Sequence, residues 1–175
     1  LLGHLAKTRA KQGRLHHILF HVGIFRDTFA TQKNRESMRL IGTGSALPEK
    51  IVTNAMLSEF LDTSDEWIVP RTGIRSRHVI SHENIEDLGA NAAENALEMA
   101  GLKPEEIDYF ICSNVVNEYM TPGLSCVIAE KIGLKCPCVD INCACPGFIY
   151  AMDIAECHFL AHKVKNVLIV CAEEP

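Results

Sequence analysis

The sequence of 175 residues has no apolar run close to the roughly 20 residues that a membrane-spanning helix requires. Aromatic residues make up only 6 % of the chain and its net charge is −5, which argues against nucleic acid as the main partner. Internal repeats and low-complexity segments are absent as well. Hydrophobic residues nevertheless make up 47 %, too many for a disordered protein. The composition predicts a soluble, globular protein.

Acidic residues are scarce in residues 1–37, where seven Lys and Arg stand against two acids, a net charge of +5. Residues 38–175 contain ten Lys and Arg against twenty Asp and Glu, a net charge of −10. The first segment also lacks an initiating Met, a cleavage site behind an apolar core, and the serines of a transit peptide. We expect residues 1–37 to be a basic N-terminal extension outside the native fold, with the protein's own start at Met38.

Disulfide bonds are not expected, although the chain has eight cysteines. A domain of about 140 residues buries roughly two-thirds of its surface without them, and disulfides belong mainly to small secreted domains. Four cysteines lie in apolar runs, as buried free thiols do: Cys112, Cys126, Cys157 and Cys171. The others form the C-x-C pairs Cys136–Cys138 and Cys143–Cys145, whereas paired zinc ligands usually have about two to four residues between them. We therefore expect no metal site, and a reducing, cytoplasmic location.

Strand and helix patterns alternate after Met38. Strands are expected at 39–43, 76–80, 107–116, 138–142 and 166–172. Helices are expected at 54–61, 64–69, 85–100, 122–133 and 145–160, the third with Asn84 as its N-cap and Gly101 at its end. Such alternation, with continuous apolar strands, is typical of an α/β domain with a mostly parallel sheet. Small residues dominate the apolar stripe of the third helix, which should therefore pack closely on the sheet.

The helix expected after Cys145 is apolar nearly all round. Between Ala144 and Ala155 its only charged residue is Asp153. Such a helix belongs in the interior of a protein, between two layers. One sheet covers only one side of it, so we expect its second layer to come from a part of the protein outside this chain.

Cys145 stands where a buried strand turns into this helix, in the string DINCACPGF. A thiol there faces the positive end of the helix dipole and free backbone N–H groups, which favour a thiolate. That placement suits a nucleophilic cysteine. Pro146 suits the first helical position, because it has no N–H to leave unpaired, and Gly147 lets another group approach the backbone. A structural cysteine at a buried turn is the alternative.

Two further strings, IGTGSALP at 41–48 and DTSDEWIVPRTGIR at 62–75, precede the cysteine segment. Together the three resemble the N-terminal half of the β-ketoacyl-acyl-carrier-protein synthase III family, from Met38 to about residue 172. That family belongs to the thiolase superfamily, whose fold is two similar halves packed as αβαβα around two buried central helices. The resemblance implies that residues 38–175 are the N-terminal half of such a layered fold, which accounts for the apolar helix.

By this resemblance, Cys145 is the nucleophile that takes an acyl group, usually acetyl, from coenzyme A, and its N–H supplies part of an oxyanion hole. Trp67 matches a tryptophan that stacks on the adenine, Arg71 an arginine that contacts the phosphates, and Thr63 a threonine near the adenine. An indole face suits a purine and a guanidinium suits phosphate. An anchoring tryptophan and a solvated arginine are the alternatives.

The resemblance also places Thr121 and Phe148 at the acyl pocket, where Thr121 leaves more room than the Phe found in some family members. Pro146 departs from the family, which more often has Ala or Ser there. No cofactor is implied, because acyl-coenzyme A is a substrate.

The complete family enzyme, usually a homodimer, condenses the acyl group with malonyl carried on acyl carrier protein and releases carbon dioxide. Its condensing His and Asn lie in the second half, and the body's four histidines sit in no matching motif: His78, His82, His158 and His162. We therefore expect that this chain alone does not complete the condensation. The alternatives are another condensing enzyme, such as a secondary-metabolite starter synthase, and a non-catalytic acyl-binding or dimerisation module. The string DTSDEW argues against a third relative, hydroxymethylglutaryl-coenzyme A synthase.

Overall fold

The computed structural model describes residues 21–27, 38–115 and 119–173. The chain divides into two compact units. Among the described residues, the smaller unit consists of residues 48–81, and the larger unit contains all the others.

The smaller unit is a two-stranded antiparallel sheet with two short helices. Its elements are β3 (Lys50–Thr53), α2 (Asn54–Ser58), α3 (Asp65–Thr72) and β4 (Ser76–Val79). The buried guanidinium of Arg77 donates to Val52 O at 3.2 Å and to Asn54 Oδ1 at 2.7 Å. Asn54 Nδ2 in turn donates to Asp65 Oδ1 at 2.8 Å, which links the two helices to the strands. The three expected elements of this unit are confirmed, and β3 is an additional strand.

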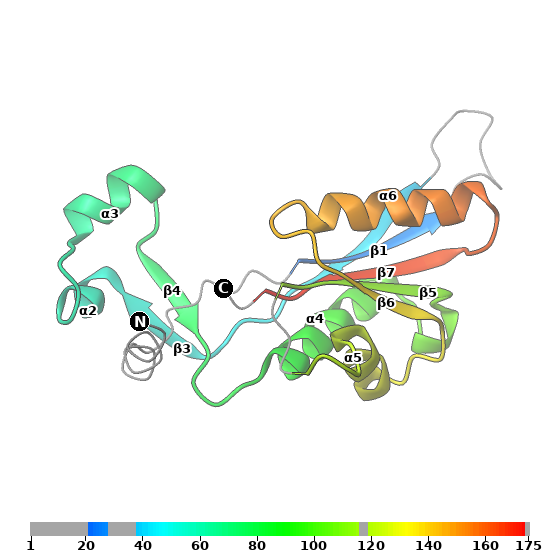
Figure 1. Ribbon diagram of the computed structural model, residues 1–175, viewed down its shortest axis with the longest axis horizontal. Helices are drawn as coiled ribbons and strands as arrows, with labels where there is room; N and C mark the ends of the chain where they lie inside the picture. The colour runs from blue at the N-terminus through cyan, green and yellow to red at the C-terminus, as the bar shows by residue number, and fades with distance from the viewer. Residues whose placement is uncertain (1–20, 28–37, 116–118, 174–175) are drawn as a thin grey trace, which may run out of the picture. The chain divides into compact units, whose positions relative to one another are not determined.

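The larger unit is built on one five-stranded sheet (Figure 1). Its order is β2 (Met38–Gly44), β1 (His21–Asp27), β7 (Asn166–Cys171), β5 (Tyr109–Ser113) and β6 (Cys138–Ile141). β5 is parallel to both β6 and β7, whereas β1 is antiparallel to both β2 and β7. Four strands therefore run in one direction and β1 in the other. The predicted α/β fold with a mixed, mostly parallel sheet is confirmed.

Strand β1 corrects the expectation that residues 1–37 lie outside the fold. His21–Asp27 separates β2 from β7 and pairs with both along its length. Val22, Ile24 and Phe25 are buried, as β-branched and aromatic residues in a strand covered on both faces should be. The backbone groups of β2 and β7 that face each other find their partners only through this strand. Residues 1–20 and 28–37 lie outside the described residues, and the expected start at Met38 stays a prediction.

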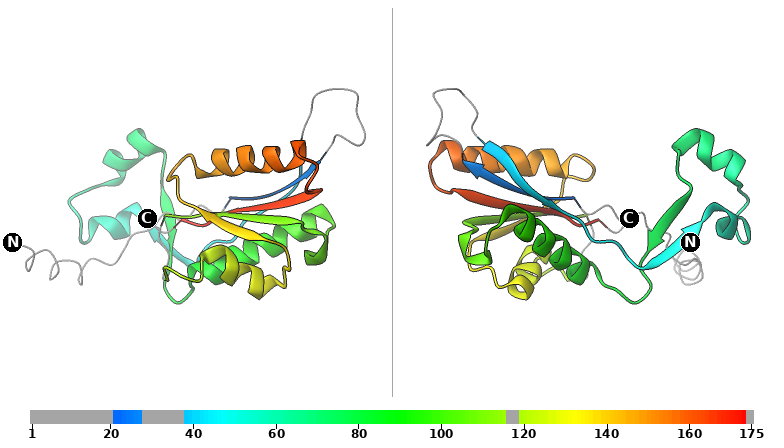
Figure 2. Two further views of the ribbon diagram at one scale, coloured as in Figure 1. Left: turned by 45° about the vertical axis from the view of Figure 1, so that its right-hand side comes forward. Right: turned by 180° about the vertical axis from the view of Figure 1, so that it is seen from behind.

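Helices cover both faces of this sheet (Figures 1 and 2). α4 (Ile85–Ala100) and α5 (Leu124–Ile132) lie on one face and α6 (Gly147–Leu160) on the other, with the short 3₁₀ turn η1 (Pro104–Glu106) before β5. The cap expected for α4 is confirmed, since Asn84 Oδ1 accepts the Asp87 N–H at 2.7 Å and Gly101 ends the helix with φ 65°. Within the described ranges, no helix combines the length and the apolar character needed to cross a bilayer.

α6 is buried on one side only. The buried residues of α6 are Gly147, Ala151, Ala155 and Phe159, and the last three pack in one core cluster with residues of β5 and β7. On its remaining surface Ile149 and Tyr150 are 59 % and 51 % exposed. The sheet of this chain supplies one layer against the helix, as the apolar pattern of α6 predicted, and the expected second layer stays a prediction.

Candidate functional site

Cys145 lies in the turn between β6 and α6, and its side chain is exposed. The residue before it, Ala144, has a φ of 52°, in the left-handed region that non-glycine residues seldom occupy. Gly147 N–H donates to Ala144 O at 2.9 Å and closes the turn. The Cys145 N–H donates no backbone hydrogen bond within the described residues. The turn thus presents both a thiol and a backbone donor at the start of a 14-residue helix.

Helix α6 begins at Gly147, two residues later than the expected helix at 145–160. Pro146 has φ −81° and ψ 5°, so it is the N-cap, and Gly147 is the first helical residue. The prediction of Pro146 at the first helical position is therefore wrong by one residue, because a ψ near zero lies outside the α-helical range. Proline remains suited to this place, since a helix cap does not require its N–H.

Gly147 allows the close approach that the sequence predicted, and the approaching residue is Ser113. A Cβ on Gly147 would overlap the Oγ of Ser113, which is 1 % exposed and is the last residue of β5. The first turn of α6 therefore rests directly on the end of a central strand. Sequence analysis missed Ser113; the available signal was a small polar residue at the end of the apolar string YFICS.

The other cysteines differ from Cys145 in burial or in position. Burial raises the pKa of the Cys136 thiol to about 11 and that of the Cys171 thiol to about 12, and it raises the pKa of Cys112 well above its ordinary value. These three thiols stay protonated at neutral pH. Besides Cys145, the exposed cysteines are Cys126, in the first turn of α5, and Cys157, near the end of α6; both are helical residues, whereas Cys145 precedes its helix.

Phe148, the residue after Gly147 in α6, lines an open cavity of about 420 Å³. The other walls are Val22 and Gly23 of β1, the residues Leu40, Thr43 and Gly44 of β2, and Ser45. Phe25 packs beside Phe148, with their ring centroids 6.3 Å apart. Thr121, the second residue expected at an acyl pocket, is exposed and precedes α5 in the same unit.

Trp67 and Arg71 come together on α3 of the smaller unit. The Arg71 guanidinium carbon lies 4.5 Å from the centroid of the Trp67 ring, and Arg71 Nη1 donates to Trp67 O at 2.9 Å. Trp67 is 55 % exposed, so the pair offers an aromatic face and a cation to solvent. Thr63 is half-buried just before the helix, whose N-cap is Ser64. These three residues and Cys145 belong to different units.

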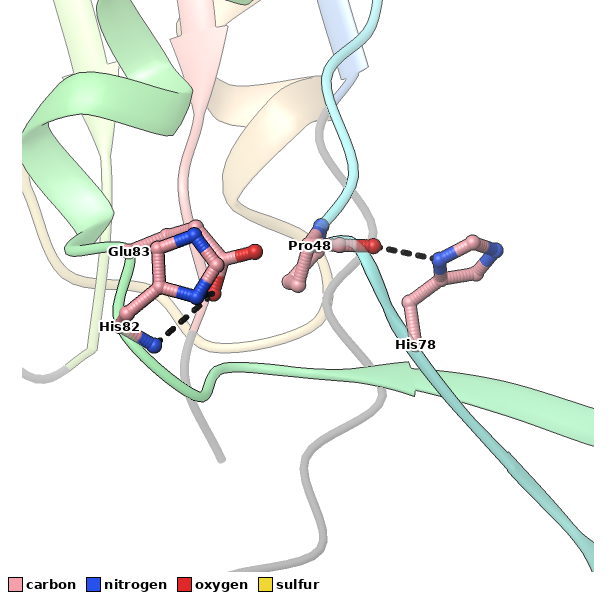
Figure 3. Close-up of polar contacts among 4 residues, drawn as sticks. All are labelled: Pro48, His78, His82 and Glu83. Atoms are coloured by element: carbon pink, nitrogen blue, oxygen red, sulfur yellow. Dashed lines mark hydrogen bonds and ion pairs between the residues drawn. The ribbon is translucent and has the colours of Figure 1, made fainter.

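The contacts of three histidines of the body are with groups other than cysteine. His78 Nδ1 lies 2.6 Å from Pro48 O and donates to it, because a carbonyl can only accept (Figure 3). The backbone N–H of His82 donates to the Glu83 carboxylate at 3.2 Å (Figure 3). His158 stacks on Tyr109, with ring centroids 4.4 Å apart. In the described part of the chain, no cluster of three or more His, Cys, Asp or Glu suited to a metal ion occurs.

Comparisons with known proteins agree with this arrangement. Residues 69–174 match the family described as thiolase, N-terminal domain. The chain is 47 % identical over 138 residues to the β-ketoacyl-[acyl-carrier-protein] synthase III of Clostridium acetobutylicum, covering 78 % of this chain and 42 % of that protein. It is 42 % identical over 134 residues to the enzyme of the same name from Escherichia coli O1:K1, covering 75 % of this chain and again 42 % of the relative.

Solved structures give the same result. The crystal structure of 3-oxoacyl-[acyl-carrier-protein] synthase III from Aquifex aeolicus matches with a TM-score of 0.74 at 42 % identity, over 76 % of this chain and 44 % of that one. The priming β-ketosynthase of the R1128 polyketide pathway matches with a TM-score of 0.74 at 38 % identity, over 78 % and 41 %. The chain spans less than half the length of these relatives. The chain therefore belongs to the thiolase family, matching its N-terminal domain and, within that family, the N-terminal part of the β-ketoacyl-[acyl-carrier-protein] synthases III.

Proposed function

We propose that this chain carries the acyl-accepting cysteine of a β-ketoacyl-acyl-carrier-protein synthase III, which starts fatty-acid synthesis. The observation that supports this most is Cys145, exposed at the entrance of α6 on a turn with a left-handed Ala144. Backbone strain of this kind concentrates at functional sites. The similarity to synthases III adds the reaction class.

In the proposed first step, the Cys145 sulfur attacks the carbonyl carbon of an acyl-coenzyme A, with acetyl as the expected acyl group. The carbonyl oxygen becomes an oxyanion, which the Cys145 N–H and the positive end of α6 stabilise. The bond to the coenzyme A sulfur then breaks, and coenzyme A leaves as its thiol with the proton that the Cys145 thiol has lost. The acyl group remains as a thioester on Cys145, directed toward Phe148 and, by resemblance, Thr121.

In the same proposal, Trp67 and Arg71 recognise the coenzyme A. The exposed indole stacks on the adenine, and the guanidinium pairs with phosphate once it leaves its place over the ring. Thr63, next to the N-cap of α3, completes this contact. No resident cofactor is needed, because coenzyme A enters and leaves as part of the substrate.

The second step joins the acyl group to malonyl on acyl carrier protein with loss of carbon dioxide, in a homodimeric enzyme. By resemblance, this step uses a His and an Asn from the second half of the family fold. We expect the 175-residue chain to form no 3-ketoacyl product from acetyl-coenzyme A and malonyl carrier protein. Product formation by the purified chain would overturn this part of the proposal.

The acylation step is tested by incubating the chain with acetyl-coenzyme A and measuring its intact mass. We expect one acetyl adduct that maps to Cys145 and is lost in Cys145→Ser. Cys157→Ser is the matched control, because Cys157 is equally an exposed thiol of the α6 region. An adduct that survives Cys145→Ser, or no adduct even in the complete protein, would instead favour a non-catalytic acyl-binding or dimerisation module.

A second substrate separates coenzyme A recognition from chemistry. Trp67→Ala and Arg71→Ala should slow acylation by acetyl-coenzyme A about fivefold or more, since each loses about 1 kcal/mol or more of contact. Acylation by a short acetyl thioester without the nucleotide should not change. Equal slowing with both substrates would show that the two residues support the fold rather than bind coenzyme A.

A starter synthase of a polyketide pathway is the second candidate. The match to the R1128 priming β-ketosynthase, at 38 % identity, supports it. The two candidates differ in the acyl group they accept. Comparing acylation by acetyl-coenzyme A with acylation by longer acyl-coenzyme A esters distinguishes them.

A further inference from the structure

Cys126 and Cys138 form a pair of thiols that the proposed function does not use. Their Sγ atoms lie 3.6 Å apart and share a hydrogen bond, although the residues come from different elements. Cys126 is exposed on α5, and Cys138 is the half-buried first residue of β6. A disulfide bond is about 2.05 Å long, so small side-chain movements would bring the two sulfurs into bonding distance.

A neighbouring contact holds the two elements in this register. The Asp140 carboxylate of β6 accepts the Ser125 N–H at 2.7 Å, and it lies against Gly123, which leaves no room for a Cβ there. Gly123 is the N-cap of α5 and has no side chain to cap the helix, so Asp140 caps the helix from the adjacent strand. Cys138 and Asp140 are two residues apart on one strand and share a face. Cys126 directly follows Ser125, so the hydrogen bond between Ser125 and Asp140 holds both thiols in place.

We propose that Cys126 and Cys138 are a reversible redox pair that forms a disulfide with hydrogen peroxide and links α5 to β6. The Cys126 sulfur attacks one peroxide oxygen, the O–O bond breaks, and hydroxide leaves, so that Cys126 becomes a sulfenic acid. The Cys138 sulfur then attacks the Cys126 sulfur, the S–O bond breaks, and the S–S bond forms. The thiol protons convert both leaving hydroxides into water, and the two thiols supply the two electrons that reduce the peroxide.

The order of the two steps follows from the surroundings of each thiol. Burial raises the pKa of the Cys138 thiol, against a hydrogen bond from Ser125 that lowers it, and the neighbouring Cys126 and Asp140 raise it further. Cys126 is the thiol that solvent and peroxide reach. Reduction by a small thiol such as glutathione reverses the link by thiol–disulfide exchange.

The test is to treat the reduced chain with a slight excess of hydrogen peroxide, block free thiols with an alkylating reagent and map linked peptides by mass spectrometry. We expect a mass loss of two hydrogens and a Cys126–Cys138 link. The link should raise the melting temperature by about 5 °C or more, because it restrains the unfolded chain. Glutathione should return both values to those of the reduced chain.

Four serine variants decide the assignment. Cys126→Ser should abolish the link and its stabilisation, whereas Cys157→Ser and Cys136→Ser should leave both unchanged. A link that uses Cys136 or Cys145 in the unsubstituted chain would overturn the proposal. So would peroxide treatment that leaves Cys126 and Cys138 reduced or carries Cys126 to the sulfinic acid without a link. Cys138→Ser should leave Cys126 open to that over-oxidation, because the thiol that would trap its sulfenic acid as a disulfide is gone. If Cys138 were too far from Cys126 to form the link, Cys138→Ser would not change the oxidation of Cys126.

Discussion

Single residues decide which thiols of this chain are reactive. Cys145 is exposed at the entrance of α6, whereas Cys112 and Cys171 are buried in β5 and β7. The buried thiols therefore act as small apolar side chains of the core. Their ionisation, rather than their nucleophilicity, has a measurable effect on the protein, because a buried thiolate is unfavourable.

Cys171 makes the fold sensitive to alkali. Burial, with the nearby charge of Glu173, raises the pKa of its thiol to about 12 from an ordinary 9.0, so the folded chain keeps the proton over a range where the unfolded chain loses it. Its stabilising effect is complete below pH 9 and falls by about 1.4 kcal/mol for each pH unit above that, until about pH 12. We predict that the melting temperature of Cys171→Ala falls less between pH 8 and pH 10.5 than that of the unsubstituted chain.

The measurement is thermal unfolding followed by circular dichroism at several pH values. Cys157→Ala, which removes an exposed thiol of the same chain, is the control variant. Cys112 and Cys136 also have raised pKa values, so the slope in Cys171→Ala should shrink rather than vanish. An unchanged slope would contradict the prediction.

At the scale of elements, the backbones of β2 and α4 pack so closely that no Cβ fits between them at Gly42 and Gly44. A Cβ on Gly42 would lie 2.5 Å from Ala96 O, and one on Gly44 would overlap Ala92 O. The small-residue stripe of α4 predicted this close packing, because Ala92 and Ala96 let the helix backbone reach the sheet. The glycines on the opposing strand complete the contact.

Gly44→Ala should therefore destabilise the chain by about 1–3 kcal/mol or more, because backbone atoms of α4 cannot yield as a flexible side chain can. Urea denaturation measures this loss. Ser45→Ala, one residue further along and exposed, is the matched control and should change stability by less than about 0.5 kcal/mol. Equal stabilities of the two variants would mean that β2 does not pack against α4 as described.

The presence of most helices and strands could be predicted from the local sequence pattern, whereas the residues at which they begin and end could be predicted less well. Asn84 and Gly101 mark α4 correctly, because a cap and a left-handed glycine act locally. α5 begins at Leu124, two residues later than the start expected at Pro122. Its cap comes from Asp140 of β6, which is far along the chain and leaves no local signal. The contact between Ser113 and Gly147 likewise depends on how β5 and α6 pack, and no local pattern contains it. The position of Cys145 between a strand and a helix was predictable from the local pattern, whereas its role stays a prediction.

For the molecule as a whole, β1 is the unpredicted element with the largest effect, because it lies inside the five-stranded sheet, whereas the equally unpredicted β3 pairs only with β4. The apolar residues of β1 stand in a basic, histidine-rich segment, and one of its partners, β7, is near the other end of the chain. A pairing so distant in sequence leaves no local signal. Charge composition separated residues 1–37 from the body, but backbone pairing joins residues 21–27 to it.

Ile24→Ala tests this strand. Ile24 is 0 % exposed, so its truncation should lower the free energy of unfolding by about 2–5 kcal/mol. Leu160→Ala removes a side chain of similar size that is 53 % exposed on α6, and it should cost much less. Urea denaturation of both variants gives the comparison. If Ile24→Ala costs no more than Leu160→Ala, the strand is not part of the sheet in solution.

The position of β7 in the sheet also determines when the larger unit can fold during synthesis. β1 and β2 form one antiparallel pair and β5 and β6 one parallel pair, and β7 is the strand that joins the two pairs. Until Asn166–Cys171 has left the ribosome, the two strand pairs cannot be joined into one sheet, and the strand edges that would bind β7 lack their partner. Pairing of such high contact order is slow. Chaperones that bind exposed strand edges would therefore meet this chain in the interval before β7 emerges, and folding would finish only after that strand is made.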